Sequence, residues 1–176
     1  IYAVVDHDDF KSKLKNCKFI DRSKTSATDN APSIMPVLEA CEHLPETSLV
    51  VLFQATNPFI KYEFIDEGIE RVISGDYDSA VSVYRDKKFT WLNNKPPYDI
   101  KNKPRRQDWD GSLRENGAFY IDHVKNLKEH KHFLCGRIAL VECDELSAYE
   151  IDTQIDWVVT EALHKQFILK PSHTDL

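Results

Sequence analysis

A strand–helix–strand alternation between residues 49 and 84 constrains the fold of this chain more than any other feature of its sequence. Leu49 to Phe53 is a continuous apolar run bounded by turn residues, which is typical of a central strand covered on both faces. Apolar residues then recur on one face of a helix from Tyr62 to Ser74, and Ser79 to Tyr84 has the pattern of another strand. Alternation on this scale predicts βαβ units, so we expect an α/β fold with three layers and a mainly parallel sheet.

The same criteria place the other elements. They predict strands at residues 1–5, 18–20, 88–92, 117–121 and 137–143, and helices at residues 8–14, 32–41, 123–129 and 155–167. A proline- and lysine-rich excursion at about residues 85–104 interrupts this order. Because 176 residues suit one domain, we predict a single domain over residues 1–170 and a tail at residues 171–176. A strand begins at the first residue without an initiator Met or a signal peptide, so we interpret the domain as truncated at its N-terminus.

Composition argues against several classes of protein. The chain has 23 basic and 29 acidic residues, a formal net charge of −6, which disfavours a general nucleic-acid-binding role. No apolar run approaches the roughly 20 residues of a membrane-spanning helix, so we expect no membrane partner. The four cysteines have no C-x-x-C spacing, and we expect them to be reduced inside a cell.

An acidic pair near the C-terminus is a candidate metal site. If residues 149–152 are extended, Glu150 and Asp152 lie on one face, because side chains alternate along a strand. Two adjacent carboxylates supply the hard oxygen ligands that suit Mg²⁺. The alternative is that Asp152 or Thr153 caps the helix that follows.

A basic cluster at residues 101–108 is a candidate anion site in an otherwise acidic chain. Arg105 and Arg106 are adjacent, and a pair of arginines can hold a carboxylate or phosphate through paired hydrogen bonds. A solvated loop and a nuclear-import signal are the alternatives for this cluster.

Two turns are candidates for ligand contacts. Residues 54–58 follow the apolar strand, and ligands of open α/β sheets bind beyond the carboxyl ends of the strands. Residues 115–117 lead into a strand, where Gly117 would allow close backbone approach. Each is equally compatible with an ordinary turn. The sequence has no nucleophile elbow, no Walker loop and no histidine spacing of weight for a metal.

These segments together resemble the acylneuraminate cytidylyltransferases, the CMP-sialic acid synthetases, and the animal form more than the bacterial. The longest match is the string Arg-Arg-Gln-Asp-Trp-Asp-Gly at 105–111, followed by Glu-Asn-Gly-Ala-Phe-Tyr at 115–120. Shorter similarities cover Gln54 to Pro58, Asp6-His7-Asp8, the set Arg22, Asp29 and Ser33, and Glu150-Ile151-Asp152 with Asp156. The resemblance runs across nearly the whole chain.

The resemblance implies a Rossmann-like nucleotidyltransferase fold, in which the excursion is a dimerisation arm, and a homodimer or higher even oligomer. It implies that CTP and a sialic acid react to give CMP-sialic acid and pyrophosphate with Mg²⁺. The basic stretch from Lys101 to Arg106 would also serve as a nuclear-import signal, so the expected location is the nucleus or the cytoplasm. The catalytic residues implied are Arg106, Gln107 and Asp152, with Asp152 and Glu150 as metal ligands. The substrate-binding residues implied are Arg22 and Ser33 for the nucleotide, Gln54, Arg105 and Tyr120 on the sugar side, and Asn116 near the substrates.

Three departures from the family pattern leave other functions open. The family's glycine-rich phosphate-binding loop has no counterpart, Glu150 stands where Asp is usual, and Asn57 stands where Ser is usual. Without that loop the chain as given would be inactive even if its parent is an enzyme. The alternative is therefore a non-catalytic paralogue or fragment that keeps the dimer fold as a binding or scaffold subunit. A weaker alternative is a cytidylyltransferase for another keto-sugar acid, such as Kdo.

Overall fold

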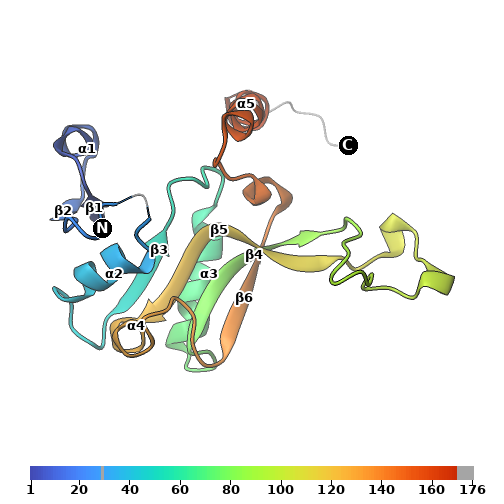
Figure 1. Ribbon diagram of the computed structural model, residues 1–176, viewed down its shortest axis with the longest axis horizontal. Helices are drawn as coiled ribbons and strands as arrows, with labels where there is room; N and C mark the ends of the chain where they lie inside the picture. Colours follow the sequence, from blue (N-terminus) through green and yellow to red (C-terminus); the bar gives the residue numbers. More distant parts are fainter. Residues whose placement is uncertain (29, 170–176) are drawn as a thin grey trace. The chain divides into compact units, whose positions relative to one another are not determined.

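The computed structural model describes residues 1–28 and 30–169, and the chain packs into two compact units (Figure 1). The first unit consists of residues 1–52, 69–80 and 120–139, and the second of residues 53–68, 81–119 and those from 140 onward. The single domain over residues 1–170 stays a prediction, and the predicted tail at 171–176 lies outside the described residues.

A four-stranded sheet has the order β3–β5–β4–β6, and β1 and β2 pair separately in parallel. Strand β5 runs antiparallel to β3, because Val124 N donates to Ser48 O at one end and Gln54 N donates to Ala118 O at the other. The strands are β1 Tyr2–Val5, β2 Lys18–Asp21, β3 Leu49–Phe53, β4 Ser79–Asp86, β5 Ser112–His123 and β6 Ile138–Cys143. Apart from β5, the strands are mainly parallel, as predicted.

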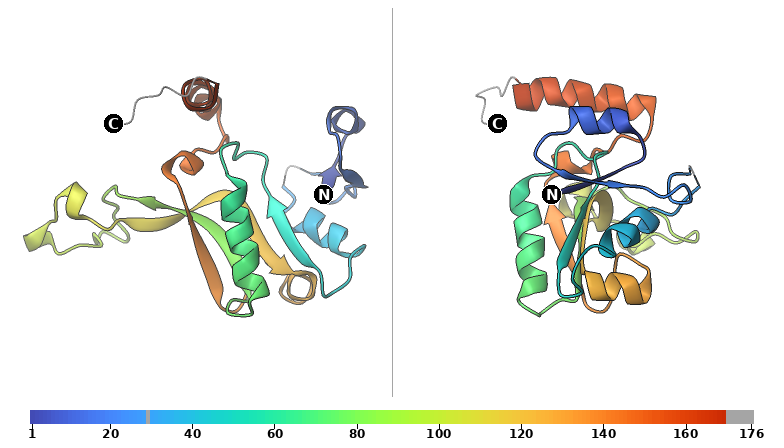
Figure 2. Two further views of the ribbon diagram at one scale, coloured as in Figure 1. Left: turned by 180° about the vertical axis from the view of Figure 1, so that it is seen from behind. Right: turned by 90° about the vertical axis from the view of Figure 1, so that its left-hand side faces the viewer.

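The helices lie on both faces of the sheet in the first unit (Figure 2). On one face, buried side chains of α2 and α4, including Val37 and Leu127, pack with Val50 and Leu52 of β3. The C-terminal half of α3 lies on the opposite face. The helices are α1 Asp8–Lys13, α2 Ile34–Cys41, α3 Tyr62–Ile73, α4 Val124–His130 and α5 Gln154–Leu163, with 3₁₀ turns at Ile100–Asn102, Arg106–Asp108 and Glu145–Ala148 and a π-helix at His164–Leu169. Within the described ranges, no helix is both long and apolar enough to cross a membrane.

The strand predicted at residues 88–92 is wrong, and the extended conformation considered for residues 149–152 is not part of a strand either. Residues 88–92 lie in an irregular connection between β4 and β5, where Leu92 pairs only with Lys95 across a two-residue turn. Asn93 and Asn94 make that turn with φ of 50° and 62°. Residues 149–152 are also irregular, because Ile151 N donates to Thr56 O while Asp152 N turns back to the Asp156 side chain. Local β-propensity cannot form a strand where no neighbouring strand is available.

Candidate functional site

Two buried asparagines join three loops of the second unit. Asn57, which is fully buried, donates through Nδ2 to the carbonyl oxygens of Asn116 (2.9 Å) and Ser147 (2.8 Å). Asn116 is 2% exposed and donates through its own Nδ2 to the Ser147 carbonyl at 3.1 Å. Buried amides of this kind fix geometry, since leaving one unpaired costs about 1–3 kcal/mol. This buried amide junction ties the turn after β3 and the middle of β5 to the loop that carries Glu150.

The Glu150 carboxylate lies over the backbone of Gly117. A Cβ at this glycine would collide with Glu150 Oε2 and would lie 3.5 Å from Gln54 Oε1. Gly117 also has a φ of +66°, a conformation that L side chains rarely adopt. The absence of a side chain at position 117 therefore brings Gln54 and Glu150 together.

Asp152 stands beside Glu150 and is not the helix cap. Thr153 is the N-cap of α5, and its hydroxyl accepts from Asp156 N at 3.3 Å. The Asp156 carboxylate completes the capping box by accepting from Thr153 N at 2.8 Å. Of the two capping alternatives, the structure selects Thr153. The Asp152 carboxylate lies next to Glu150 although residues 149–152 form no strand, and the metal role of the pair stays a prediction.

The two carboxylates have the chemistry of a magnesium site. Burial first, and then the charge of Asp152, raises the pKa of Glu150 above its ordinary value. A cation would relieve this repulsion. Across residues 1–28 and 30–169, no three His, Cys, Asp or Glu side chains group into a metal-binding set. Mg²⁺ usually takes only one or two carboxylates and keeps several waters, so the pair fits it.

The basic string lies away from this pair within the second unit (Figure 1). Arg105, Arg106 and Gln107 are all exposed and sit in the connection between β4 and β5. Arg105 donates to both oxygens of Asp108, at 2.6 and 3.1 Å. One copy of the chain therefore does not bring the predicted sugar-side arginines next to Glu150 and Asp152.

The predicted nucleotide residues lie in the first unit. Arg22 is 3.7 Å from Asp6 and donates to the Ser26 carbonyl, so it closes the loop after β2. Ser33 is exposed at the start of α2, and its side chain makes no cap hydrogen bond. Asp29 lies outside the described residues.

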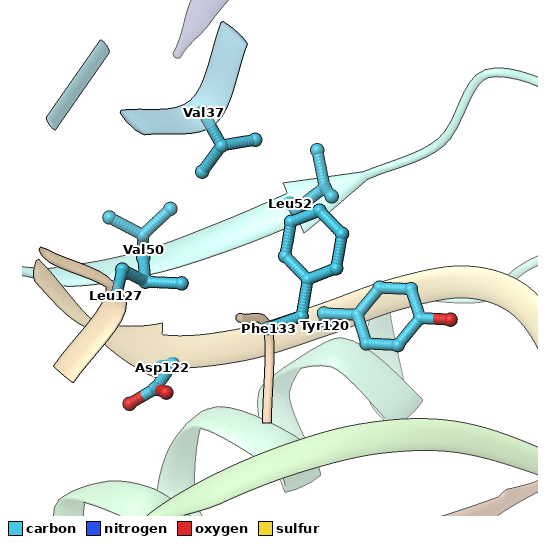
Figure 3. A pocket seen from close by; sticks show the side chains of 7 residues that line it. All are labelled: Val37, Val50, Leu52, Tyr120, Asp122, Leu127 and Phe133. Atoms are coloured by element: carbon cyan, nitrogen blue, oxygen red, sulfur yellow. The ribbon is translucent and has the colours of Figure 1, made fainter. Parts of the chain in front are cut away.

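Tyr120, also in the first unit, lines a small apolar pocket (Figure 3). Its ring stacks on Phe133 with centroids 5.0 Å apart and planes at 24°. Asp122 lines the same pocket. Sequence patterns did not indicate Phe133, because it lies outside every regular element and its periodicity gives no signal. The predicted contact of Tyr120 with a sugar stays a prediction.

Replacing Gly117 tests how the acidic pair is held. We expect Gly117→Ala and the control Gly75→Ala each to cost about 1–2 kcal/mol of unfolding free energy, since both glycines have positive φ. A Cβ added at Gly75 would meet no atom within 4 Å, so only Gly117→Ala displaces Glu150. NMR titration should then show the pKa of Glu150 returning toward its ordinary value. An unchanged titration in Gly117→Ala would contradict this geometry.

The raised pKa of Glu150 predicts a pH-dependent effect of Glu150→Gln. The native state holds this proton more tightly than the unfolded state, so stability falls as pH rises from the unfolded pKa through the raised native one. Gln resembles the protonated form. We therefore expect Glu150→Gln to stabilise the protein at pH 7 and to have little effect at pH 4, as measured by urea unfolding. Glu145→Gln, at a nearby exposed position, provides the comparison for the general effect of removing one carboxylate.

Known sequences resemble this chain over nearly all of its length. No family model matches it. It is 30% identical over 172 residues to N-acylneuraminate cytidylyltransferase B of Danio rerio, covering 92% of this chain and 40% of that protein. The N-acylneuraminate cytidylyltransferase of Oncorhynchus mykiss is also 30% identical over 172 residues, covering 92% and 39%. The chain thus spans about 40% of the length of these curated relatives.

Two solved structures share the fold. The 4-diphosphocytidyl-2C-methyl-D-erythritol synthase of Anaerococcus prevotii aligns with a TM-score of 0.64 at 14% identity, covering 94% of this chain and 78% of that one. A CMP:2-keto-3-deoxy-manno-octonic acid synthetase complexed with CTP aligns with a TM-score of 0.65 at 12% identity, covering 95% and 81%. These alignments confirm the predicted nucleotidyltransferase fold, while its dimerisation arm stays a prediction.

The sequence relatives are more informative than these distant structures. Animal N-acylneuraminate cytidylyltransferases align across 92% of the chain, which includes the strings around Arg105 and Glu150 that carried the predicted resemblance. The chain is therefore similar to the N-acylneuraminate cytidylyltransferases over nearly all of its own length.

Proposed function

We propose that the protein containing this chain transfers CMP from CTP to a sialic acid and releases pyrophosphate. The observation that carries the proposal is the position of Glu150 and Asp152. Neither carboxylate takes part in the capping box of α5, and the buried amide junction holds their loop so that Glu150 lies near Gln54. The similarity to the N-acylneuraminate cytidylyltransferases supplies the substrate class. Since the chain spans about 40% of its curated relatives, the activity is proposed for the whole protein.

The chain's own side chains would act by positioning substrates and balancing charge. In this reaction a sugar hydroxyl attacks the α-phosphorus, and pyrophosphate leaves in line with it. Arg105 and Arg106 would hold the sugar carboxylate, a planar anion that suits guanidinium groups. Gln107 and Gln54 would orient the sugar, and Asp152 with Glu150 would hold Mg²⁺. Bound there, Mg²⁺ would neutralise charge on the leaving pyrophosphate.

The nucleotide contacts are proposed from family position and from exposure. Ser33 is exposed and would be accessible to CTP. Arg22 is partly exposed and is held in place by Asp6, so we propose that it contacts CTP as well. Asn116 differs from the other candidates, because its amide is engaged with Ser147 inside the junction. We propose that it acts near the substrates by holding the loop of Glu150 in place.

We also propose a homodimer formed through the connection between β4 and β5. Trp91 is 59% exposed and Leu92 is 77% exposed, an aromatic and aliphatic content that suits an interface. The separation of the basic string from Glu150 within one copy supports a site completed by a second copy.

The proposed location is the nucleus or the cytoplasm. The basic stretch from Lys101 to Arg106 is largely on the surface, where an import receptor could reach it.

Asp152→Asn tests the proposed reaction in the full-length protein. We expect pyrophosphate release from CTP and sialic acid to fall by about 100-fold or more, because the variant loses the principal metal ligand. Added Mg²⁺ should raise the melting temperature of the wild type and not that of the variant. The exposed Asp66→Asn serves as a control that keeps both properties. A folded wild type that binds Mg²⁺ without releasing pyrophosphate would instead support a non-catalytic scaffold.

Co-expression of two inactive variants tests the shared site. Arg106→Ala alone should lose at least about tenfold in activity, because a charged hydrogen bond to the sugar acid is removed. Mixed dimers of Arg106→Ala and Asp152→Asn chains each regain one intact site if the string serves the other copy. Random pairing then restores about a quarter of wild-type activity. No recovery, or a monomer by light scattering, would contradict the shared site.

A further inference from the structure

We infer that Arg85 is a positioning residue, which clamps the base of the β4–β5 connection (residues 87–111) and so sets where Arg105, Arg106 and Gln107 stand. This inference rests on the proposed function for the role of those three residues. The clamp itself rests on contacts within the second unit.

Arg85 joins three segments at the end of β4. Its guanidinium donates to both oxygens of Glu142 in β6, at 2.7 and 2.5 Å. A third nitrogen donates to the Asp110 carbonyl at 3.0 Å, where the chain returns toward β5. The paired contact also lowers the pKa of the Glu142 carboxyl, which keeps both partners charged. A planar guanidinium fixes direction in a way that a lysine cannot.

The end of β4 and the residues just before β5 are closely packed at the base of the connection. Gly111 has a φ of +79°, and a Cβ there would lie 2.7 Å from the Asp86 carbonyl oxygen. The Asp86 side chain is 6% exposed, accepts a hydrogen bond from Lys88 N at 2.8 Å and forms an ion pair with Arg114 Nε at 3.3 Å. The end of β4 and the start of β5 are therefore held together by noncovalent contacts at the point where the connection leaves and rejoins the sheet.

Packing inside the connection links its base to the basic string at residues 105–107. Phe89, Tyr98 and Trp109 form an aromatic cluster with ring centroids 4.9 to 6.3 Å apart, and Lys103 Nζ lies 4.6 Å from the Phe89 centroid. Trp109 directly follows the 3₁₀ turn Arg106–Asp108, and Trp109 N donates to Arg106 O. The string is thus fastened to a small rigid cluster, and that cluster is fastened at the base by Arg85.

A matched arginine at the other end of the same strand pair provides the control. Arg137 contacts Asp78 at 3.4 Å and donates to the Gly75 carbonyl at 2.8 Å, so it also combines a carboxylate with a backbone oxygen. It lies in the first unit, where its side chain contacts Asp78 and Gly75. We therefore compare Arg85→Met with Arg137→Met in the full-length protein.

Hydrogen exchange measures the clamp without reference to any substrate. In Arg85→Met, amides hydrogen-bonded inside the connection, such as those of Leu92, Lys95 and Asp108, should exchange at least tenfold faster than in the wild type. Arg137→Met should leave them unchanged. Equal exchange in the two variants would overturn the clamp.

Kinetics measure the consequence for the site. Arg85→Met should raise KM for the sialic acid at least tenfold with little change in KM for CTP or in melting temperature, and Arg85→Lys should recover part of the loss. Faster exchange with unchanged KM values would overturn the positioning role. If the wild type transfers no CMP, the proposed function fails, and the exchange comparison still decides whether Arg85 fixes the connection.

Discussion

The buried amide junction is the constraint on which the candidate site depends. Asn57 donates to the carbonyls of both Asn116 in β5 and Ser147 before the acidic pair, and the Asn116 amide adds a direct bond to Ser147. Both amides are buried from solvent, so the two loops and the strand must move together or lose several of these bonds at once. The junction thereby converts flexible loop residues into a fixed platform for Glu150 and Asp152. Asn57, the residue that departs from the family's usual Ser, makes this connection.

Local patterns were enough to predict the strands and helices that pack on one another. The limits of β3 match the prediction, and those of α3 are within one residue of it, since apolar periodicity records which face is buried. The same reasoning failed at residues 88–92, and residues 149–152, considered as an extended segment, also form no strand. Both segments have suitable composition, but strand formation also needs a neighbour, which depends on parts of the fold distant in sequence.

The sequence predicted which residue types form the candidate site, but not how they are arranged in space. The acidic pair and the basic string could be found as short clusters of like charge, and the helix cap was predicted as either Asp152 or Thr153. The buried amide junction gave no sequence signal, because Asn116 and Ser147 lie 59 and 90 residues after Asn57. Nor could spacing show that the Gly117 backbone lies under the Glu150 carboxylate, since that contact arises only when loops pack.

Gly117 has a consequence for how such a chain can change during evolution. A glycine with positive φ inside a strand is typical of a bulge, which ends one alternation of side chains and begins another. Before it, Leu113 to Glu115 are exposed, whereas most residues after it are buried. Substitutions at the exposed residues 113–115 therefore leave the buried face of β5 intact, whereas substitutions after Gly117 act directly on the core.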